Sequence, residues 1–293
     1  MKFKQSTTIF LFLILSAGVF AQTIVQDDEP NQTRSGDFLG IRLRSEIQAI
    51  VKEIERKCNK KILAEFINQK EFMLGSSYIS DAEGIPVVLI DYKLEDDAKK
   101  LEAVAAHELL HLRLRVNNYP TFLFSPTVQT AKGRAVDVEQ STANDLLSLI
   151  EHRIFKSEME RFGLNKLLDL AGDTAKVAKR RRGEPDEQSD SINYARAILE
   201  YPNQKDVEEV ARIYKENNWT RALESGKRIA DFISQSNLQT PAAVEAVFLK
   251  CIMELYRPPS THTFKLTVDP QNKFFRRMII GTARRAVQRR KRG

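Results

Sequence analysis

Apolar and charged residues alternate at helical spacing over residues 38–58, which predicts an amphipathic helix. The apolar positions of this helix are Leu39, Ile41, Leu43, Ile47, Ile50, Val51 and Ile54. Three short apolar runs follow, over residues 62–67, 72–79 and 86–92, and each predicts a strand. The sequence Asp-Ala-Glu-Gly at 81–84 predicts a turn between the last two strands.

Two longer helices are predicted in the next segment of the chain. Residues 95–115 predict a helix because residues 96–115 lack Pro and Gly and are rich in Ala and Leu. Residues 117–136 contain Asn, Pro and Gly, and predict a loop long enough to form the rim or lid of a site. A second long helix is expected over 136–162, where it stops at Gly163.

Helical patterns dominate the rest of the chain. Residues 164–183 predict a helix, and the composition of residues 183–190 predicts a linker. Residues 190–257 predict three or four amphipathic helices. The breaks between them fall at Tyr201-Pro202, Asn217-Asn218 and Thr240-Pro241. We therefore expect an α+β fold whose C-terminal region, residues 163–270, is all-α apart from a short strand at 263–268.

The first 21 residues have the pattern of a cleaved export signal. Lys2 and Lys4 precede an apolar run from Ile9 to Phe20, and small residues surround the end of this run at Ala21. The alternative is a retained membrane anchor, but the run is short for a membrane span. The polar residues 22–37 predict a disordered segment. We expect the mature protein to be secreted or periplasmic.

The two cysteines, Cys58 and Cys251, allow one disulfide in an exported protein. Their separation in sequence says nothing about their distance in space, so two buried free thiols are the alternative.

The formal net charge of +7 is concentrated at the C-terminal end. Residues 271–293 carry nine Lys or Arg and no acid, and the first 21 residues carry two Lys, which leaves −4 for residues 22–270. Apolar residues alternate with the basic ones in this tail at roughly helical spacing, which favours an interfacial helix on an anionic surface. A disordered basic end is the alternative, and we expect no specific nucleic-acid partner.

The pentapeptide His107-Glu-Leu-Leu-His111 is the strongest chemical signal in the chain. On a helix, His107 and His111 project from the same face and can share a metal ion. Glu108 lies beside them and can act on a metal-bound water without binding the metal itself.

With an apolar strand before the motif helix, this segment resembles the zincin metallopeptidases. The order of one helix, three strands, the motif helix, a loop and a second long helix over residues 38–162 resembles the compact gluzincin core. This resemblance implies one zinc ion per chain, held by His107, His111 and a glutamate from the second long helix, with Glu108 as the catalytic base. It implies hydrolysis of peptide bonds in a peptide or protein substrate through a zinc-bound water, with the strand at 86–92 aligning the substrate.

Glu151 is the favoured third ligand. It lies on an apolar stripe with Leu147, Ile150 and Ile154, where a carboxylate is costly unless it is paired or binds a metal. His152 and an acid elsewhere are alternatives for the ligand, and an ion pair with Arg113 or Arg115 is the alternative role for Glu151. Glu139 and Glu158 lie towards the ends of the helix and are expected to be solvated.

Two further roles are left open by the sequence. Phe155 stands where many gluzincins have an acid that orients the first histidine. Candidates for the hydrogen bond that orients this histidine are Asn144, Asp145 and Ser148. Candidates for stabilising the oxyanion are His152, His262, Tyr78 and Tyr119.

The sequence thus predicts an exported zinc metallopeptidase of the gluzincin type. The alternatives are a non-enzymatic binding protein with a degenerate zinc site, and a zinc hydrolase of a non-peptide amide. An intact Glu108 argues against a purely structural site, which needs no base. The oligomeric state is not indicated by the sequence.

Overall fold

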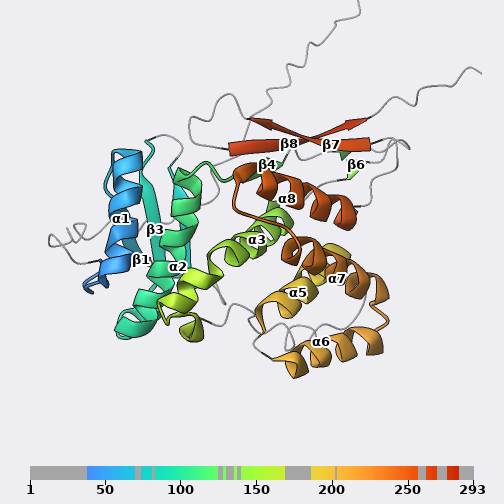
Figure 1. The fold of residues 1–293 in the computed structure, drawn as a ribbon, viewed down its shortest axis with the longest axis horizontal. Helices are drawn as coiled ribbons and strands as arrows, with labels where there is room; N and C mark the ends of the chain where they lie inside the picture. The colour runs from blue at the N-terminus through green and yellow to red at the C-terminus, as the bar shows by residue number, and fades with distance from the viewer. Residues whose placement is uncertain are drawn as a thin grey trace, which may run out of the picture.

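A computed structural model describes residues 38–69, 74–80, 83–124, 128–129, 135–136, 140–168, 186–201, 203–256, 262–268 and 276–283 (Figure 1). The expected export signal (1–21) and the N-terminal segment (22–37) lie outside these residues, as does most of the helix expected over 164–183. None of the helices in the described ranges is both long enough and apolar enough to cross a membrane.

The fold is α+β, as expected, and mostly helical. The helices are α1 (Ser45–Cys58), α2 (Ala98–Val116), α3 (Gln140–Arg161), α5 (Glu187–Glu200), α6 (Gln204–Glu216), α7 (Thr220–Ser234) and α8 (Pro241–Tyr256), with 3-10 turns at Tyr92–Leu94 and Asn165–Leu167. The strands are β1 (Leu63–Ile67), β2 (Gly75–Ile79), β3 (Pro86–Asp91), β4 (Thr121–Phe124), β5 (Val128–Gln129), β6 (Ala135–Val136), β7 (His262–Val268) and β8 (Arg276–Ala283).

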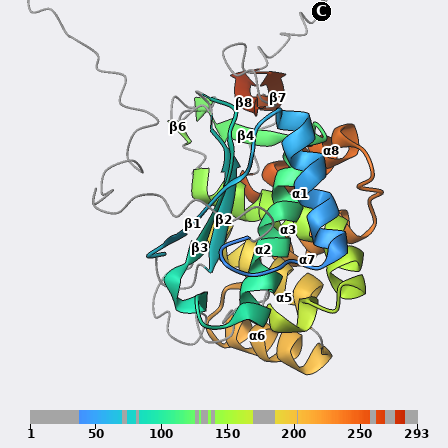
Figure 2. The same cartoon turned by 90° about the vertical axis from the view of Figure 1, so that its left-hand side faces the viewer.

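The first three strands form one sheet in the order β1-β3-β2, with β1 parallel and β2 antiparallel to β3. Helices α1 and α2 cover one face of this sheet (Figure 2), and fully buried side chains such as Ile54, Val88 and Leu109 fill the space between them. Because β3 is paired on both sides, it cannot align a substrate as an edge strand, contrary to the expectation for residues 86–92. The strand that borders α2 at the sheet edge is β2.

Helix α1 begins later than predicted, at Ser45 rather than Phe38. Leu39 and Gly40 adopt positive φ angles of 50° and 80°, which interrupt a right-handed helix. The following Arg44 donates hydrogen bonds to the Glu102 carboxylate of α2 and to the carbonyl oxygen of Phe162. These contacts tie the start of α1 to both α2 and the end of α3.

Helix α3 lies between two hydrophobic cores and contributes to each (Figure 1). Its C-terminal half, with Phe155 and Met159, packs into the core around the first sheet. Its N-terminal half, with Leu146, Leu147 and Ile150, packs against α5, α7 and α8. A boundary after residue 162 therefore does not separate the two cores, because one helix completes both.

The helical region follows the predicted breaks closely. Helix α5 ends before Tyr201, α6 is followed by Asn217 and Asn218, and α8 begins at Pro241. Helix α5 begins at Glu187, inside the segment predicted as a linker (183–190), and Asp186 caps it by accepting a hydrogen bond from the Ser189 N–H. Of the three or four amphipathic helices predicted over residues 190–257, the structure has four, α5 to α8.

A second three-stranded sheet, in the order β4-β8-β7, corrects two predictions. Strand β4 lies in the segment expected to be a loop, and β8 lies in the tail expected to be a helix or a disordered end. β8 pairs in parallel with β4 and antiparallel with β7 (Figure 1). Strand β7 confirms the short strand expected at 263–268, and the other described elements within residues 163–270 are helical. Pairing between strands so far apart along the chain leaves no local signal in the hydrophobic pattern.

Both cysteines are free thiols. Cys58, at the end of α1, is half-buried beside the first core, and Cys251, in α8, is buried in the core of the helical region. The structure thus shows the second of the two alternatives, separate thiols, although Cys58 is only partly buried.

Candidate metal centre

Helix α2 places His107 and His111 one turn apart on the same face, as the motif predicts. Their rings meet edge to face with centroids 4.7 Å apart, and the two Nε2 atoms lie 3.1 Å apart. Two nitrogen ligands of a tetrahedral zinc ion with bonds of about 2.0–2.1 Å lie about 3.3 Å apart. The observed separation of the two Nε2 atoms is close to this value.

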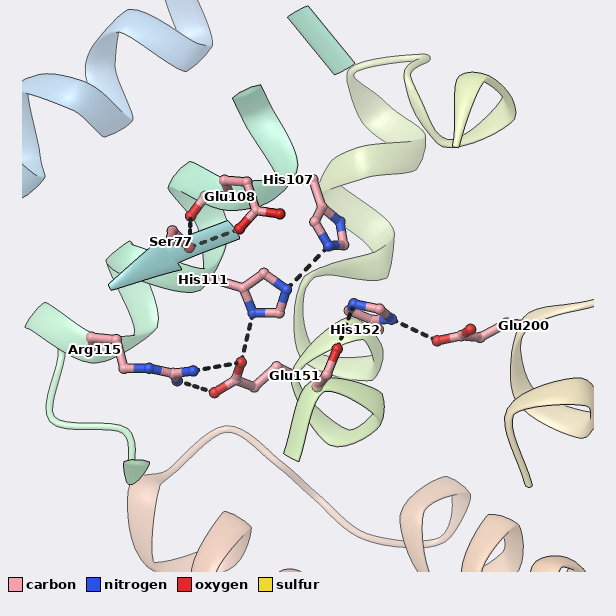
Figure 3. Close-up of polar contacts among 9 residues, drawn as sticks. Ser77, His107, Glu108, His111, Arg115, Glu151, His152 and Glu200 are labelled. Carbon is pink, nitrogen blue, oxygen red and sulfur yellow. Dashed lines mark hydrogen bonds and ion pairs between the residues drawn. The ribbon is translucent and has the colours of Figure 1, made fainter. Parts of the chain in front are cut away.

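His152 of α3 completes a cluster of three histidines (Figure 3). One ring nitrogen from each of His107, His111 and His152 lies within 4.8 Å of the other two, which is close enough for all three to bind one metal ion. The His152 ring centroid lies 4.7 Å from that of His107 and 5.4 Å from that of His111. The cluster therefore joins two helices that are separated in sequence by the strands β4, β5 and β6.

Two carboxylates hold the outer nitrogens of this cluster. His111 Nδ1 lies 2.6 Å from Oε2 of Glu151, and His152 Nδ1 lies 2.6 Å from Oε1 of Glu200, which comes from α5 (Figure 3). An imidazole that donates its Nδ1–H to a carboxylate presents the lone pair of Nε2 on its other side. His111 thus turns Nε2 to Nε2 of His107, the arrangement typical of metal-binding histidines. His152 keeps Nε2 on the side away from Glu200, where this atom also lies 3.1 Å from Ser148 Oγ.

Glu151 lies outside the histidine cluster, although the sequence favoured it as the third ligand. Its side chain is 1% exposed, and its carboxylate bonds His111 Nδ1 and the Arg115 guanidinium. Burial alone would raise the pKa of Glu151, but Arg115 and His111 outweigh it and lower the pKa to about 2. The alternative role, an ion pair with Arg115, is thus found together with a contact behind His111, and the third position of the cluster belongs to His152.

The apolar stripe of α3 was a misleading guide to its metal-binding face. Leu147 and Ile150 pack against the helical region instead of α2. Because α3 is covered on two sides, apolar residues occur around most of its circumference, and their spacing does not indicate which side faces α2. Adjacent helical residues point in directions about 100° apart, so His152 and Glu151 reach different parts of the site.

Burial favours the neutral, metal-binding form of His107 and His152. The pKa of His107 is lowered well below its usual value by burial and by the nearby His111, His152 and Arg196. Burial also lowers the pKa of His152, although Glu200 opposes this effect. The Nδ1 atom of His107 is buried and has no hydrogen-bond partner among the described residues. Three imidazoles with one nitrogen each within 4.8 Å of the other two fit a divalent transition metal.

Glu108 is buried beside the cluster, with 7% of its surface exposed. Ser77 of β2 donates a hydrogen bond of 2.8 Å to Glu108 Oε2 (Figure 3). Burial raises the pKa of Glu108, while His111 and the Ser77 hydroxyl act in the opposite direction. Gly75 permits this approach of β2 to α2, because a Cβ atom there would lie 2.7 Å from Cγ1 of Val104 and 3.0 Å from Cγ of Glu108.

Phe155, which stands where the resemblance implied an acid, packs against the histidine rings. Its ring meets His107 and His111 nearly at right angles, with centroids 5.4 Å and 5.0 Å away. Its side chain is 1% exposed, so it closes the apolar side of the cluster. Phe155 thus packs against the first histidine without giving its Nδ1 a hydrogen bond, whereas Glu151 holds Nδ1 of the second histidine, His111.

The remaining residues that the sequence suggested for orienting a histidine or stabilising the oxyanion lie at different places in the structure. Tyr78 is 47% exposed on β2, where its neighbour Ser77 occupies the face towards α2. The Tyr119 hydroxyl donates a hydrogen bond to the carbonyl oxygen of Gln239. Ser148 Oγ lies 3.1 Å from His152 Nε2, so it contacts the third histidine of the cluster and not His107, which it was a candidate to orient.

Asp145 is exposed, and its carboxylate is attracted by Arg196. Glu158 forms an ion pair with Arg113 instead of being fully solvated, whereas Glu139 and the side chain of His262 lie outside the described residues.

Sequence reasoning missed Ser77, Glu200 and the proximity of Arg196. Each comes from an element remote from the motif in sequence, and each is an ordinary polar residue in its own local pattern. The one available signal was the helical spacing of Arg196 and Glu200, which puts both on one face of α5.

Comparison with known protein families, curated proteins and solved structures gave no match. The indications of function therefore come from the geometry of the site. That geometry keeps the motif helix expected of a zincin, but it offers three histidines where the resemblance to gluzincins implied two histidines and a glutamate.

Proposed function

We propose that this protein is a zinc-dependent hydrolase of peptide bonds in which His107, His111 and His152 bind the metal and Glu108 is the catalytic base. The observation that carries the proposal is the convergence of three buried ring nitrogens within 4.8 Å, directly beside a buried carboxylate. A structural zinc site is closed by four protein ligands, whereas a catalytic site has three and leaves one position open. In the described part of the chain the cluster consists of three histidines.

The donor set favours zinc among the transition metals. Imidazole nitrogens suit several of them, including zinc, copper, iron and nickel. A glutamate next to the first histidine on the same helix is the arrangement used for zinc-dependent hydrolysis, where the carboxylate handles protons and does not bind the metal. When bound, zinc supplies a Lewis acid that polarises a carbonyl group and lowers the pKa of a water molecule.

Glu108 is suited to take a proton from the attacking water and pass it to the leaving amine. Its burial raises its pKa, which makes the carboxylate a stronger base than an exposed glutamate. The hydrogen bond from Ser77 fixes Oε2, so the carboxylate has a defined orientation. Arg115 and Glu151 lie behind His111 and neutralise one another, which leaves the metal-binding face of the ring free of that charge pair.

Strand β2 is the structural support for a peptide substrate. It pairs with β3 on one side, and its other edge has no partner strand among the described residues. Ser77 and Gly75 of this strand lie against Glu108, so an extended peptide that pairs with the free edge would pass beside the base. Peptide binding by β2 replaces the role that the sequence suggested for β3.

The proposal includes export of the protein, which rests on the apolar run and the flanking Lys2 and Lys4 of the first 21 residues. It also keeps an anionic surface as a partner of the basic C-terminal end, of which residues 284–293 lie outside the described residues.

The test combines metal analysis with one substitution in the base. We expect about one zinc ion per chain in the purified protein and in Glu108→Gln, because the substitution leaves all three histidines in place. Hydrolysis of a mixed peptide library should fall at least about 10²-fold in Glu108→Gln. The matched control is Glu160→Gln on the exposed side of α3, which should keep both metal and activity. Full activity in Glu108→Gln, or a protein that binds no metal, would contradict the proposal.

A further inference from the structure

Helix α5 brings a cationic side chain, Arg196, to the histidine cluster. Arg196 lies one turn before Glu200 on the same face of α5, and Glu200 bonds His152 Nδ1. The positive charge of Arg196 acts on both His107 and His152. The guanidinium is therefore near the cluster, on the side contributed by the helical region.

The Nε atom of the Arg196 guanidinium has no hydrogen-bond partner among the described residues, and it is buried. The charge of Arg196 acts on the Asp145 carboxyl and lowers its pKa against the larger effect of burial, but no hydrogen bond or ion pair joins the two in the described part of the chain. Other partly buried arginines near the site are paired, since Arg115 bonds Glu151 and Arg113 bonds Glu158. A buried donor without a partner is unfavourable, which indicates that another group satisfies it in the functional state.

The charge of the site favours an anion as that group. Three neutral imidazoles leave the full charge of a divalent metal in place, whereas a carboxylate ligand would cancel part of it. Arg196 adds a second positive charge next to the metal. A guanidinium presents parallel N–H donors that match the two oxygens of a carboxylate.

We propose that Arg196 binds a carboxylate of the substrate next to the scissile bond, so that the site prefers peptides with a free C-terminal carboxylate or an acidic side chain at that position. This inference rests on the proposed function, because the substrate is placed by the metal of the histidine cluster. In this role Arg196 determines specificity.

Binding of small hydroxamates to the zinc-loaded protein tests this role without turnover. A hydroxamate binds the metal, and the other end of the molecule reports on its surroundings. The probes are the monohydroxamates of succinate and glutarate, each compared with the analogue in which the free carboxylate is replaced by an amide. The two acids differ in length, so we expect the one whose carboxylate reaches Arg196 to bind about 10- to 100-fold more tightly than its amide, as measured by calorimetry.

Three substitutions separate Arg196 from general effects. Arg196→Gln should abolish the preference for the acid, and Arg196→Lys should keep part of it, since the charge is retained. Arg212→Gln, at an exposed arginine of α6, should leave the preference unchanged. Zinc content and thermal unfolding of each variant check that the site is intact.

Several results would overturn the inference. Equal binding of acids and amides by the unsubstituted protein would do so, as would a preference that persists in Arg196→Gln. An equal loss of affinity for acid and amide in Arg196→Gln would assign Arg196 to the metal-bound end of the ligand instead. A protein that discriminates between the probes but hydrolyses no peptide contradicts the proposed function alone, and one that hydrolyses peptides without discriminating contradicts this inference alone.

Discussion

Oε2 of Glu151 lies 2.6 Å from Nδ1 of His111, on the side of the imidazole ring opposite to His107 (Figure 3). The same carboxylate is paired with Arg115, so it is held from two directions and is 1% exposed. The contact makes Nδ1 the protonated nitrogen of His111 and directs the lone pair of Nε2 to the cluster. Glu151 therefore acts through His111, as a positioning residue.

The first prediction compares His152 with its neighbour Glu151. Glu151→Gln should weaken zinc binding by about 10- to 100-fold, the usual effect of removing an outer partner of a metal-binding histidine. His152→Ala should weaken it considerably more, because a ligand is lost. Competition with a chelator of known affinity measures both values. If Glu151→Gln has the larger effect, the third ligand is Glu151 and the proposed ligand set is wrong.

The second prediction concerns the pH dependence of hydrolysis. Burial raises the pKa of Glu108, and the hydrogen bond from Ser77 opposes this because it stabilises the carboxylate form. Ser77→Ala removes that stabilisation, so the pKa of Glu108 rises further and the acid limb of the kcat/KM profile moves to higher pH. Ser76→Ala, on the other face of β2, is the control and should leave the limb in place. An acid limb that does not move in Ser77→Ala would show that it reports another group.

The third prediction tests whether residues 38–162 fold without the helical region. In that fragment the N-terminal half of α3 would expose Leu146, Leu147 and Ile150, which are at most 3% exposed in the whole chain. Exposure of each side chain costs about 1.5–3 kcal/mol of stabilisation from burial. The sum for the three approaches the free energy of unfolding of a typical domain, about 5–15 kcal/mol. We expect no cooperative thermal unfolding of the fragment by circular dichroism, in contrast to the chain from residue 38 to 293. A cooperative transition in the fragment would establish an independent domain.

The fourth prediction concerns the two thiols. Burial raises the pKa of Cys251 to about 12, so its thiolate is scarce at pH 8, and its sulfur is shielded in the core of the helical region. Burial raises the pKa of Cys58 as well, but this side chain is only half-buried. A thiol reagent at pH 8 should label Cys58 in the native protein and Cys251 only in denaturant. Cys58→Ser should abolish the native reaction.

The two thiols also give a direct test of the disulfide alternative. Denatured protein that has not been reduced should react at both cysteines. If neither reacts until a reductant is added, Cys58 and Cys251 are bonded.

Elements with a strong local pattern were predicted well. The strands before the motif and the breaks of the helical region lie close to their predicted positions, because hydrophobic periodicity and turn residues act over a few neighbours. The start of α1 was missed because Leu39 and Gly40 take positive φ angles that the apolar spacing does not reveal. The sheet formed by β4, β7 and β8 was missed because its pairing is decided across the whole chain.

The sequence by itself determined the chemistry on one helix. His107, Glu108 and His111 are neighbours along α2, so their common position follows from the geometry of a single turn. Only the tertiary structure decided what else reaches them. The rotation of α3 between two cores selects His152 over Glu151, and the docking of α5 adds Glu200 and Arg196. Helix packing sets these choices through buried side chains of both cores at once, and no local spacing records that result.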